Sequence, residues 1–394
     1  MGSGSKQDRV GVRARSSASG TIKNITVMKN FFSVIQRFSA VFSVCAALFV
    51  AQSALAQPWG RFDAQNPDVH DPVIAFCEGR YYLFATGFGV QCMSSEDLET
   101  WKQEPPVFKT PPQWAVDRVK GYRGHTWAPD VQYHNGLWYL FYSCSAFGKN
   151  TSAIGLTVNK TLNPESPDYE WVDKGMVVES VPGQTPWNAI DPNMVVDKRG
   201  HVWLSWGSFW DGIQLARLKG MKRARVPRVK RVQEVQGVQV KGEPKTIARR
   251  YYSGGKHGKP SDEDLALAGE APDAGANAIE APFIIREGDW YYLFVSWDYC
   301  CKGPRSNYKT VVGRSKRVEG PYLDRQGRKM EEGGGDILLQ ASDRYYGVGH
   351  CGLLKKDGEW LFVAHGYDKL HNGQSKLFLR KMTFDDDAWP TIAQ

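Results

Sequence analysis

Long apolar runs are scarce in this 394-residue sequence. The clearest one, residues 40–51, is shorter than the roughly 20 residues that a helix needs to cross a bilayer, so it does not form a stable anchor. Helical periodicity is equally scarce, which argues against a mainly helical fold. Since 42% of the residues are apolar and 12% are aromatic, disorder and collagen are excluded, and the chain is able to bury a large core.

The segment 28–56 has the parts of a secretory signal peptide. Lys29 and Arg37 lie near its start, the apolar run follows, and residues 54–56 (Ala-Leu-Ala) have the small-x-small pattern of a cleavage site. We expect cleavage before Gln57, with an uncleaved signal anchor as the alternative.

Residues 1–27 precede this signal, and their Gly, Ser and Arg content indicates a disordered extension or tag. Residues 57–394 are predicted to form a single domain that is secreted or periplasmic. We expect this domain to be monomeric and, after signal cleavage, to have no membrane partner.

The formal net charge of +8 comes from two segments. Residues 1–56 carry +6 and residues 217–250 carry +10, which leaves −8 on the rest of the chain. Since the body is acidic, we expect no nucleic-acid partner, and we interpret the basic run as a solvated loop. The alternative is that this run adheres to an acidic polysaccharide such as pectin, or to nucleic acid.

Removal of the signal leaves six cysteines, whose spacing matches no zinc site. They are Cys77, Cys92, Cys144, Cys300, Cys301 and Cys351. The sequence does not choose among the possible pairings. A disulfide between the adjacent Cys300 and Cys301 and a set of buried free thiols both remain open.

A polar-Gly turn followed by an aromatic strand occurs five times. The five glycines are Gly79, Gly136, Gly200, Gly288 and Gly358, and their spacings are 57, 64, 88 and 70 residues. A second short apolar run precedes each turn, so each unit contains a β-hairpin. Five such units predict an all-β fold, a five-bladed β-propeller. A β-sandwich and a right-handed β-helix are the alternatives.

The spacing of 88 residues indicates an insertion between the third and fourth units. Residues 219–245 are rich in Val, Lys and Arg, and residues 253–277 are rich in Gly, Asp and Ala. We therefore expect a surface excursion over residues 217–277.

An ionisable residue lies six to nine positions before each of the five glycines. These residues are Asp71, Asp130, Asp191, Glu280 and His350. Because the first strand of each propeller blade lines the central channel, we expect them to form a ring at one end of it. A single Asp at such a place is usually a turn cap, but five residues in register favour a functional site.

Clustered, partly buried carboxyl groups have shifted pKa values, so one stays protonated while a neighbour is ionised. Glycoside hydrolysis needs such a pair: an acid for the leaving oxygen and a carboxylate that activates water or attacks. Aromatic residues close in sequence to the acids are candidates for stacking on sugar rings; they are Trp127, Phe147, Trp187, Phe209 and Trp210.

A series of motifs occurs in order along residues 68–384. It includes His-Asp-Pro at 70–72, Trp-Ala-Pro-Asp-Val at 127–131, Ser-Ala-Phe-Gly at 145–148, Ala-Ile-Asp-Pro-Asn at 189–193, Gly-Ser-Phe-Trp at 207–210, Ile-Glu-Ala-Pro-Phe at 279–283 and Asp-Tyr-Cys-Cys at 298–301. In these motifs the sequence resembles the arabinanases of glycoside hydrolase family 43. The resemblance implies a five-bladed propeller that hydrolyses α-1,5-linked L-arabinofuranosyl bonds of arabinan with inversion. Phe147 with the 207–210 segment favours an arabinanase, which we expect to be endo-acting.

Carried over to this chain, the resemblance makes Asp71 the general base, Glu280 the general acid and Asp191 the carboxylate that tunes and orients the acid. It also implies a calcium ion at His350, coordinated mostly by water, in a structural or electrostatic role. For Asp130 we expect a hydrogen-bonded structural role. The substrate-binding residues that we predict are Trp127, Phe147, Asn188, Ser208, Phe209 and Trp210.

Exo-acting α-L-arabinofuranosidases and β-xylosidases share this fold and these carboxylates, and they are the alternatives within the enzyme class. Outside it, the alternative is a non-catalytic sugar-binding propeller, which would tolerate loss of a carboxylate that this chain retains. Two features depart from the family pattern: the basic insertion after Leu218, and Cys351 directly after His350.

Overall fold

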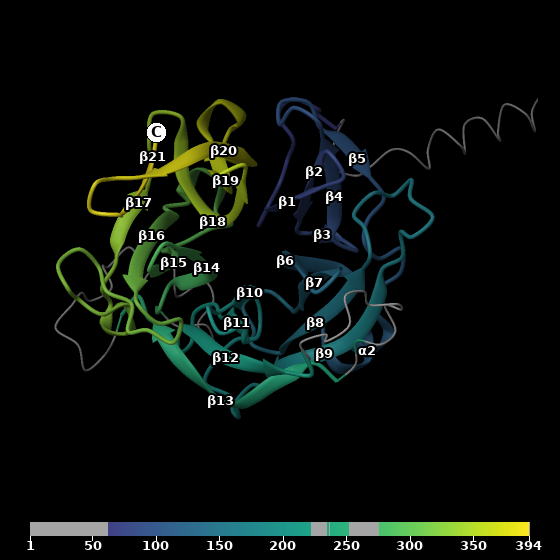
Figure 1. Ribbon diagram of the computed structural model, residues 1–394, viewed down its shortest axis with the longest axis horizontal. Helices are drawn as coiled ribbons and strands as arrows, with labels where there is room; N and C mark the ends of the chain where they lie inside the picture. The colour runs from purple at the N-terminus through teal and green to yellow at the C-terminus, as the bar shows by residue number, and fades with distance from the viewer. Residues whose placement is uncertain (1–61, 222–234, 236, 252–275, 394) are drawn as a thin grey trace, which may run out of the picture. The chain divides into compact units, whose positions relative to one another are not determined.

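The computed structural model describes residues 62–221, 235, 237–251 and 276–393. Their strands form five separate sheets arranged around a common axis, so the prediction of a five-bladed β-propeller is confirmed (Figure 1). The predicted tag, the signal peptide and most of the basic run lie outside the described residues. Within those residues, no helix is long and apolar enough to cross a membrane.

Each blade is an antiparallel sheet whose strands follow one another in chain order, apart from β3, which leaves blade 1 to pair with β6 of blade 2. Blade 1 contains β1 (Val73–Cys77), β2 (Arg80–Ala85), β4 (Gln91–Ser95) and β5 (Lys102–Glu104); blade 2 contains β3 (Gly87–Phe88), β6 (His125–His134), β7 (Leu137–Cys144), β8 (Ser152–Asn159) and β9 (Val172–Ser180); blade 3 contains β10 (Asn193–Val196), β11 (Val202–Trp206), β12 (Ile213–Lys219) and β13 (Gln239–Ala248); blade 4 contains β14 (Ile279–Glu287), β15 (Trp290–Trp297), β16 (Lys309–Ser315) and β17 (Asp336–Leu339); blade 5 contains β18 (Tyr345–Lys356), β19 (Glu359–Asp368), β20 (Gln374–Phe384) and β21 (Pro390–Ile392). A short helix, α2 (Gln113–Arg118), lies between blades 1 and 2 in the chain, and 3-10 turns occupy Gly303–Arg305, Met330–Glu332 and Lys369–His371.

The predicted hairpins join the two inner strands of the blades. In three of them both turn residues have positive φ: Glu78 and Gly79 (51° and 84°), Asn135 and Gly136 (50° and 87°), and Asp357 and Gly358 (51° and 85°). Positive φ at both positions is the mark of a two-residue type I′ turn, whose twist matches that of the strands it joins. The glycines of the repeat are therefore required by the turn.

The second strand of a blade is covered on both faces by neighbouring blades. All eight residues of β7 are buried, and its sequence Leu-Trp-Tyr-Leu-Phe-Tyr-Ser-Cys is almost continuously apolar for that reason. The same aromatic strands that defined the sequence repeat therefore form the core between the blades.

Pairing between the two ends of the described chain closes the ring. Asp68 forms an antiparallel bridge with Lys376 of β20, and the Val69 amide donates to the Ser375 carbonyl oxygen at 3.3 Å. This pairing brings the start of blade 1 against blade 5, and with it His70 and Asp71 against the inner strands β18 and β19.

The excursion predicted over residues 217–277 is wrong in its middle part. Residues 239–248 form β13, the outer strand of blade 3, which pairs with β12. Val238 and Ile247 are buried in the packing of that blade. The alternating valines at 238 and 240 have the two-residue period of a strand, and the abundance of Lys and Arg around them concealed it.

Candidate active site

The inner strands of the blades share a one-residue bulge near their start. In β14, for example, three positions separate Glu280 and Phe283, whereas their partners Ser296 and Phe294 on β15 are two apart. Five residues at this point of the five blades have φ between 42° and 57°: Asp71, Ala128, Asp191, Ala281 and His350. A bulge with a left-handed residue re-aims side chains, and such strain in residues other than glycine is characteristic of functional sites.

The predicted ring of five ionisable residues is wrong at Asp130. In blade 2 the left-handed position belongs to Ala128, and Asp130 lies two residues further along β6. Its carboxylate accepts the Met194 amide at 2.7 Å and the Asn193 side-chain amide at 3.4 Å. Asp130 therefore ties blade 2 to blade 3, which agrees with the structural role expected for it. Ala128 lies eight residues before its hairpin glycine, as Asp71 and His350 do, whereas Asp130 lies six residues before it, so the spacing already recorded the difference.

In four blades, the amide of the left-handed residue is held by a side chain of the preceding blade. The pairs are Thr86 Oγ1 with the Ala128 amide at 2.9 Å, Ser143 Oγ with the Asp191 amide at 3.0 Å, Ser296 Oγ with the His350 amide at 2.8 Å, and His365 Nδ1 with the Asp71 amide at 3.0 Å. Each acceptor lies seven or eight residues after a hairpin glycine, so it too belongs to the repeat.

Blade 3 provides no such side chain for the amide of blade 4, and the Asp191 carboxylate accepts that amide in its place. Gly207 lies where the other blades have the acceptor side chain, and the Ala281 amide instead donates to Asp191 Oδ2 at 3.1 Å. Gly207 has φ of 134°, and a Cβ there would lie 2.4 Å from the Gly212 carbonyl oxygen, so a larger residue does not fit. Asp191 therefore holds the peptide that directly follows Glu280.

Asp71 lies between two imidazole rings. Its Oδ1 is 2.8 Å from Nδ1 of His70 and 2.8 Å from Nδ1 of His350, and its Oδ2 accepts the Thr86 hydroxyl at 2.6 Å. Burial by itself would raise the pKa of Asp71, but His350 and His70 hold it well below the usual range. Asp71 is therefore an ionised carboxylate, able to accept a proton.

The pKa of Glu280 is shifted in the opposite direction to that of Asp71. Its Oε1 accepts the Tyr308 hydroxyl at 2.7 Å, and its Oε2 accepts the Ser208 hydroxyl at 2.8 Å. Burial raises the pKa of Glu280 in spite of these two hydrogen bonds. Burial also raises the pKa of Asp191 well above its usual value, with the charges of Glu280 and Asp71 acting in the same direction. The pKa of Asp71 is therefore lowered while that of Glu280 is raised, and carboxyl groups with pKa values shifted in opposite directions are what acid and base catalysis requires.

His350 supplies positive charge to this group of acids. Burial acts to lower its pKa, but Asp71, and then Asp191 and Glu280, raise it to about 9. One ring nitrogen already faces Asp71, so a single nitrogen remains for a metal ion, whereas Ca²⁺ prefers oxygen ligands. These residues fit only an ion held almost entirely by water. The calcium ion stays a prediction, and no reaction step below depends on it.

The sequence model for glycosyl hydrolases family 43 matches residues 65–390. The chain belongs to glycosyl hydrolase family 43. It is 44% identical over 330 residues to an extracellular exo-α-(1→5)-L-arabinofuranosidase of Cellvibrio japonicus (strain Ueda107), a match covering 84% of this chain and 87% of that protein. It is 34% identical over 355 residues to an extracellular endo-α-(1→5)-L-arabinanase of Bacillus subtilis (strain 168), covering 89% and 95% of the two chains. The crystal structure of an exo-1,5-α-L-arabinanase from a bovine ruminal metagenomic library matches with a TM-score of 0.74 and 56% identity, covering 85% of this chain and all of that one.

Two of the predicted substrate-binding residues of this family 43 protein lie next to Glu280. Ser208 pairs with Glu280 through an isolated backbone bridge and through its hydroxyl. The Phe209 ring lies 5.7 Å from that of Tyr299, and its amide donates to the Ile279 carbonyl oxygen. The 207–210 segment therefore borders the start of β14.

For the other four predicted substrate-binding residues, the contacts described here are with residues other than the three carboxylates. Trp127 donates its ring N–H to His125, Asn188 accepts the Ser152 hydroxyl, the Trp210 carbonyl accepts the Asn277 side-chain amide, and Phe147 is 68% exposed. Their contact with substrate stays a prediction.

Four residues of the site were absent from the sequence prediction: His70, Thr86, Tyr308 and His365. Thr86 and His365 follow the hairpin glycines at the same distance as Ser143, so an alignment of the second strands would have found them. His70 is part of the His-Asp-Pro motif. Tyr308 comes from the segment before β16 and belongs to no repeat, so nothing in the sequence pattern marks it.

Replacement of Tyr308 tests the acid assignment through pH. The Tyr308 hydroxyl stabilises ionised Glu280 and so lowers its pKa; Tyr308→Phe removes that hydrogen bond and keeps the ring. The pKa of Glu280 then rises, and the alkaline limb of the kcat/KM profile moves to higher pH by roughly 0.5 to 1 unit. The measurement is a pH profile beside Tyr322→Phe, a buried tyrosine whose hydroxyl donates to the Val318 carbonyl oxygen. A shift to lower pH, or an equal shift in Tyr322→Phe, contradicts the assignment.

Proposed function

We propose that this family 43 protein is an inverting glycoside hydrolase that cleaves α-1,5-linked L-arabinofuranosyl bonds of arabinan. The observation that carries the proposal is the occurrence of an ionised carboxylate, Asp71, and a carboxyl group of raised pKa, Glu280, at the starts of the inner strands of blades 1 and 4 of one propeller. The relatives, which are named as an exo-α-(1→5)-L-arabinofuranosidase and an endo-α-(1→5)-L-arabinanase, support the substrate class.

In the proposed reaction, protonated Glu280 donates its proton to the glycosidic oxygen that leaves. Asp71 takes a proton from a water molecule, whose oxygen attacks the anomeric carbon from the opposite face of the sugar. Solvent then gives Glu280 a new proton, and Asp71 releases to solvent the proton that it took from the water. Both carboxyl groups thereby regain the protonation states in which they started. Asp191 contributes by holding the Ala281 amide, and hence the backbone of Glu280, in place.

Exo action is our first candidate for the mode of cleavage. The exo-acting proteins named above share 56% and 44% of their residues with this chain, whereas the endo-acting relative shares 34%. Endo action, which we expected from the resemblance to arabinanases, is the second candidate.

Product analysis of residues 57–394 on linear debranched arabinan tests this proposal, with arabinoxylan and an aryl arabinofuranoside as comparison substrates. Exo action releases one short product of constant length from the first minutes, with a slow fall in viscosity; endo action gives mixed oligosaccharides and a fast fall. Proton NMR of the first product reports whether the anomeric configuration is inverted. Absence of any release from arabinan overturns the substrate assignment.

We also infer that the protein is exported. The predicted signal peptide at 28–56 and the relatives named as extracellular support this inference. An N-terminus at Gln57 in protein recovered outside the cytoplasm is the expected result, and an intact 28–56 segment would contradict it.

A further inference from the structure

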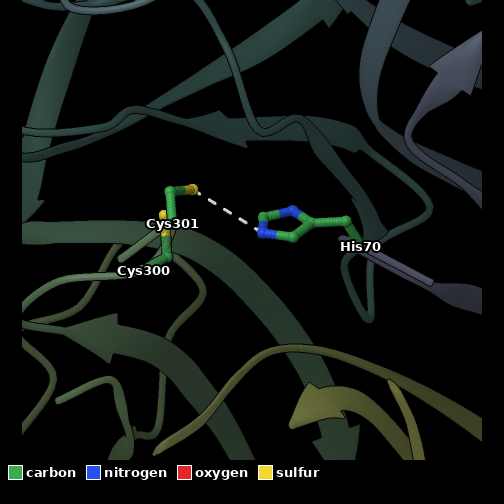
Figure 2. A group of neighbouring side chains, drawn as sticks. All are labelled: His70, Cys300 and Cys301. Carbon is green, nitrogen blue, oxygen red and sulfur yellow. Dashed lines mark hydrogen bonds between the residues drawn. The ribbon is translucent and has the colours of Figure 1, made fainter. Parts of the chain in front are cut away.

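Two thiols and an imidazole meet beside the proposed base. Cys300 and Cys301 follow β15 of blade 4, and His70 precedes β1 of blade 1, yet Figure 2 shows the Cys301 side chain pointing at the His70 ring. Cys301 Sγ lies 3.6 Å from His70 Nε2, and one ligand atom from each of the three residues lies within 4.8 Å of the others. All six cysteines of the described chain are free, so these two sulfur atoms are available as ligands.

The separation of these atoms matches a tetrahedral metal site. A Zn²⁺ ion bound to sulfur at about 2.3 Å and to nitrogen at about 2.0 Å holds those two atoms roughly 3.5 Å apart. The observed 3.6 Å between Cys301 Sγ and His70 Nε2 agrees with that value. A set of two sulfurs and one imidazole nitrogen suits Zn²⁺ and related thiophilic ions, and does not suit Ca²⁺ or Mg²⁺.

Asp71 orients the histidine for this role. His70 Nδ1 is 2.8 Å from Asp71 Oδ1, so the ring proton on Nδ1 is donated to the carboxylate and Nε2 turns toward the sulfur. Metal-binding histidines characteristically donate their other N–H to a carboxylate in this way. The Tyr367 hydroxyl lies 2.9 Å from the same Nε2 and would lose that contact when an ion binds there. It would still accept a hydrogen bond from the Cys301 amide at 2.7 Å.

The three ligands are accessible from solvent. Cys301 is exposed, and Cys300 and His70 are half-buried. Three protein ligands leave the fourth tetrahedral position open to water or to another small ligand.

We propose that His70, Cys300 and Cys301 bind a thiophilic divalent cation such as Zn²⁺, and that the bound ion inhibits hydrolysis. Binding releases to solvent the protons held by the two sulfur atoms and by Nε2 of His70, and changes no oxidation state. The inhibitory effect rests on the proposed function: His70 contacts Oδ1 of Asp71 through Nδ1, so an ion on Nε2, with the water or other ligand in its fourth position, lies one imidazole ring away from the proposed base and obstructs the approach of substrate.

Cobalt absorbance tests the site without any need for activity. Residues 57–394 are reduced, freed of reductant under anaerobic conditions, shown by thiol titration to hold free Cys300 and Cys301, and titrated with Co²⁺. We expect a thiolate-to-cobalt charge-transfer band that saturates at one equivalent and disappears when Zn²⁺ is added. Cys301→Ser should abolish the band, whereas Cys77→Ser, which replaces a half-buried thiol on β1, should retain it. No band in the reduced protein, or an equal band in Cys301→Ser, overturns the site.

Inhibition is then measured on arabinan. Zn²⁺ should lower the rate of the parent chain and of Cys77→Ser, and a chelator should restore it. Cys301→Ser should need about 10-fold or more Zn²⁺ for the same inhibition. Zn²⁺ that binds without lowering the rate overturns the inhibitory part. A chain that hydrolyses no arabinan at all contradicts the proposed function instead, while the absorbance titration still decides the metal site.

Discussion

Glu280→Gln is expected to lower kcat on linear arabinan by about 10²-fold to 10⁴-fold, the usual contribution of a positioned general acid. The amide keeps the size of the side chain between Tyr308 and Ser208 but has no proton to give to the leaving oxygen. On a nitrophenyl arabinofuranoside the loss should be much smaller, because nitrophenolate leaves without prior protonation. Steady-state kinetics on the two substrates measures the difference.

Glu287→Gln is the matched control, since Glu287 lies at the other end of the same strand, β14, and contacts Lys355 and Trp360 at the surface. It should leave both rates within about twofold of the parent chain, because surface substitutions rarely disturb a distant site. Equal losses of Glu280→Gln on both substrates would contradict the role of Glu280 as the acid.

Asp71→Asn is expected to lower kcat by about 10²-fold to 10⁴-fold on both substrates alike. The asparagine cannot accept the proton of the attacking water, and a better leaving group does not replace that step. It also removes the negative charge between His70 and His350, so the pKa of His350 falls toward its ordinary value. The two rates and the melting temperature of the variant are the measurements.

Asp130→Asn is the control, because it replaces a buried aspartate that takes no part in the proposed reaction. Its carboxylate ties blade 2 to the Met194 amide of blade 3, so we expect a lower melting temperature with hydrolysis retained in the folded protein. If Asp71→Asn lost activity on arabinan but kept it on the nitrophenyl substrate, Asp71 would act on the leaving group. That result would reverse the roles assigned to Asp71 and Glu280.

The propeller was predictable because its cause is local and repeated. Each polar-Gly pair forms a turn that needs positive φ, as Asn135 and Gly136 show, and each following aromatic strand is buried on both faces. Both requirements act within about ten residues of chain, so they leave a pattern that a single sequence displays five times. The three carboxylates were predicted as site residues for the same reason, since they occur eight or nine residues before a hairpin glycine.

The outer strand of blade 3 was missed because composition obscured a short periodic signal. Residues 239–248 carry lysines on the exposed positions of β13, and the neighbouring basic run drew the prediction toward a loop. A strand at the edge of a sheet needs only one apolar face, so only a few apolar residues in the sequence indicate its presence.

By itself, the sequence determined the five hairpins, the family and the places of Asp71, Asp191 and Glu280 along the chain. Only the tertiary structure decided which groups touch them. In blade 2 the left-handed position belongs to Ala128 and not to Asp130, the missing side chain at Gly207 gave the Ala281 amide to Asp191, and ring closure brought His70 against Cys301, 231 positions away. These contacts join residues of different blades, and their geometry depends on how the blades pack around the axis, which no local pattern of residues encodes.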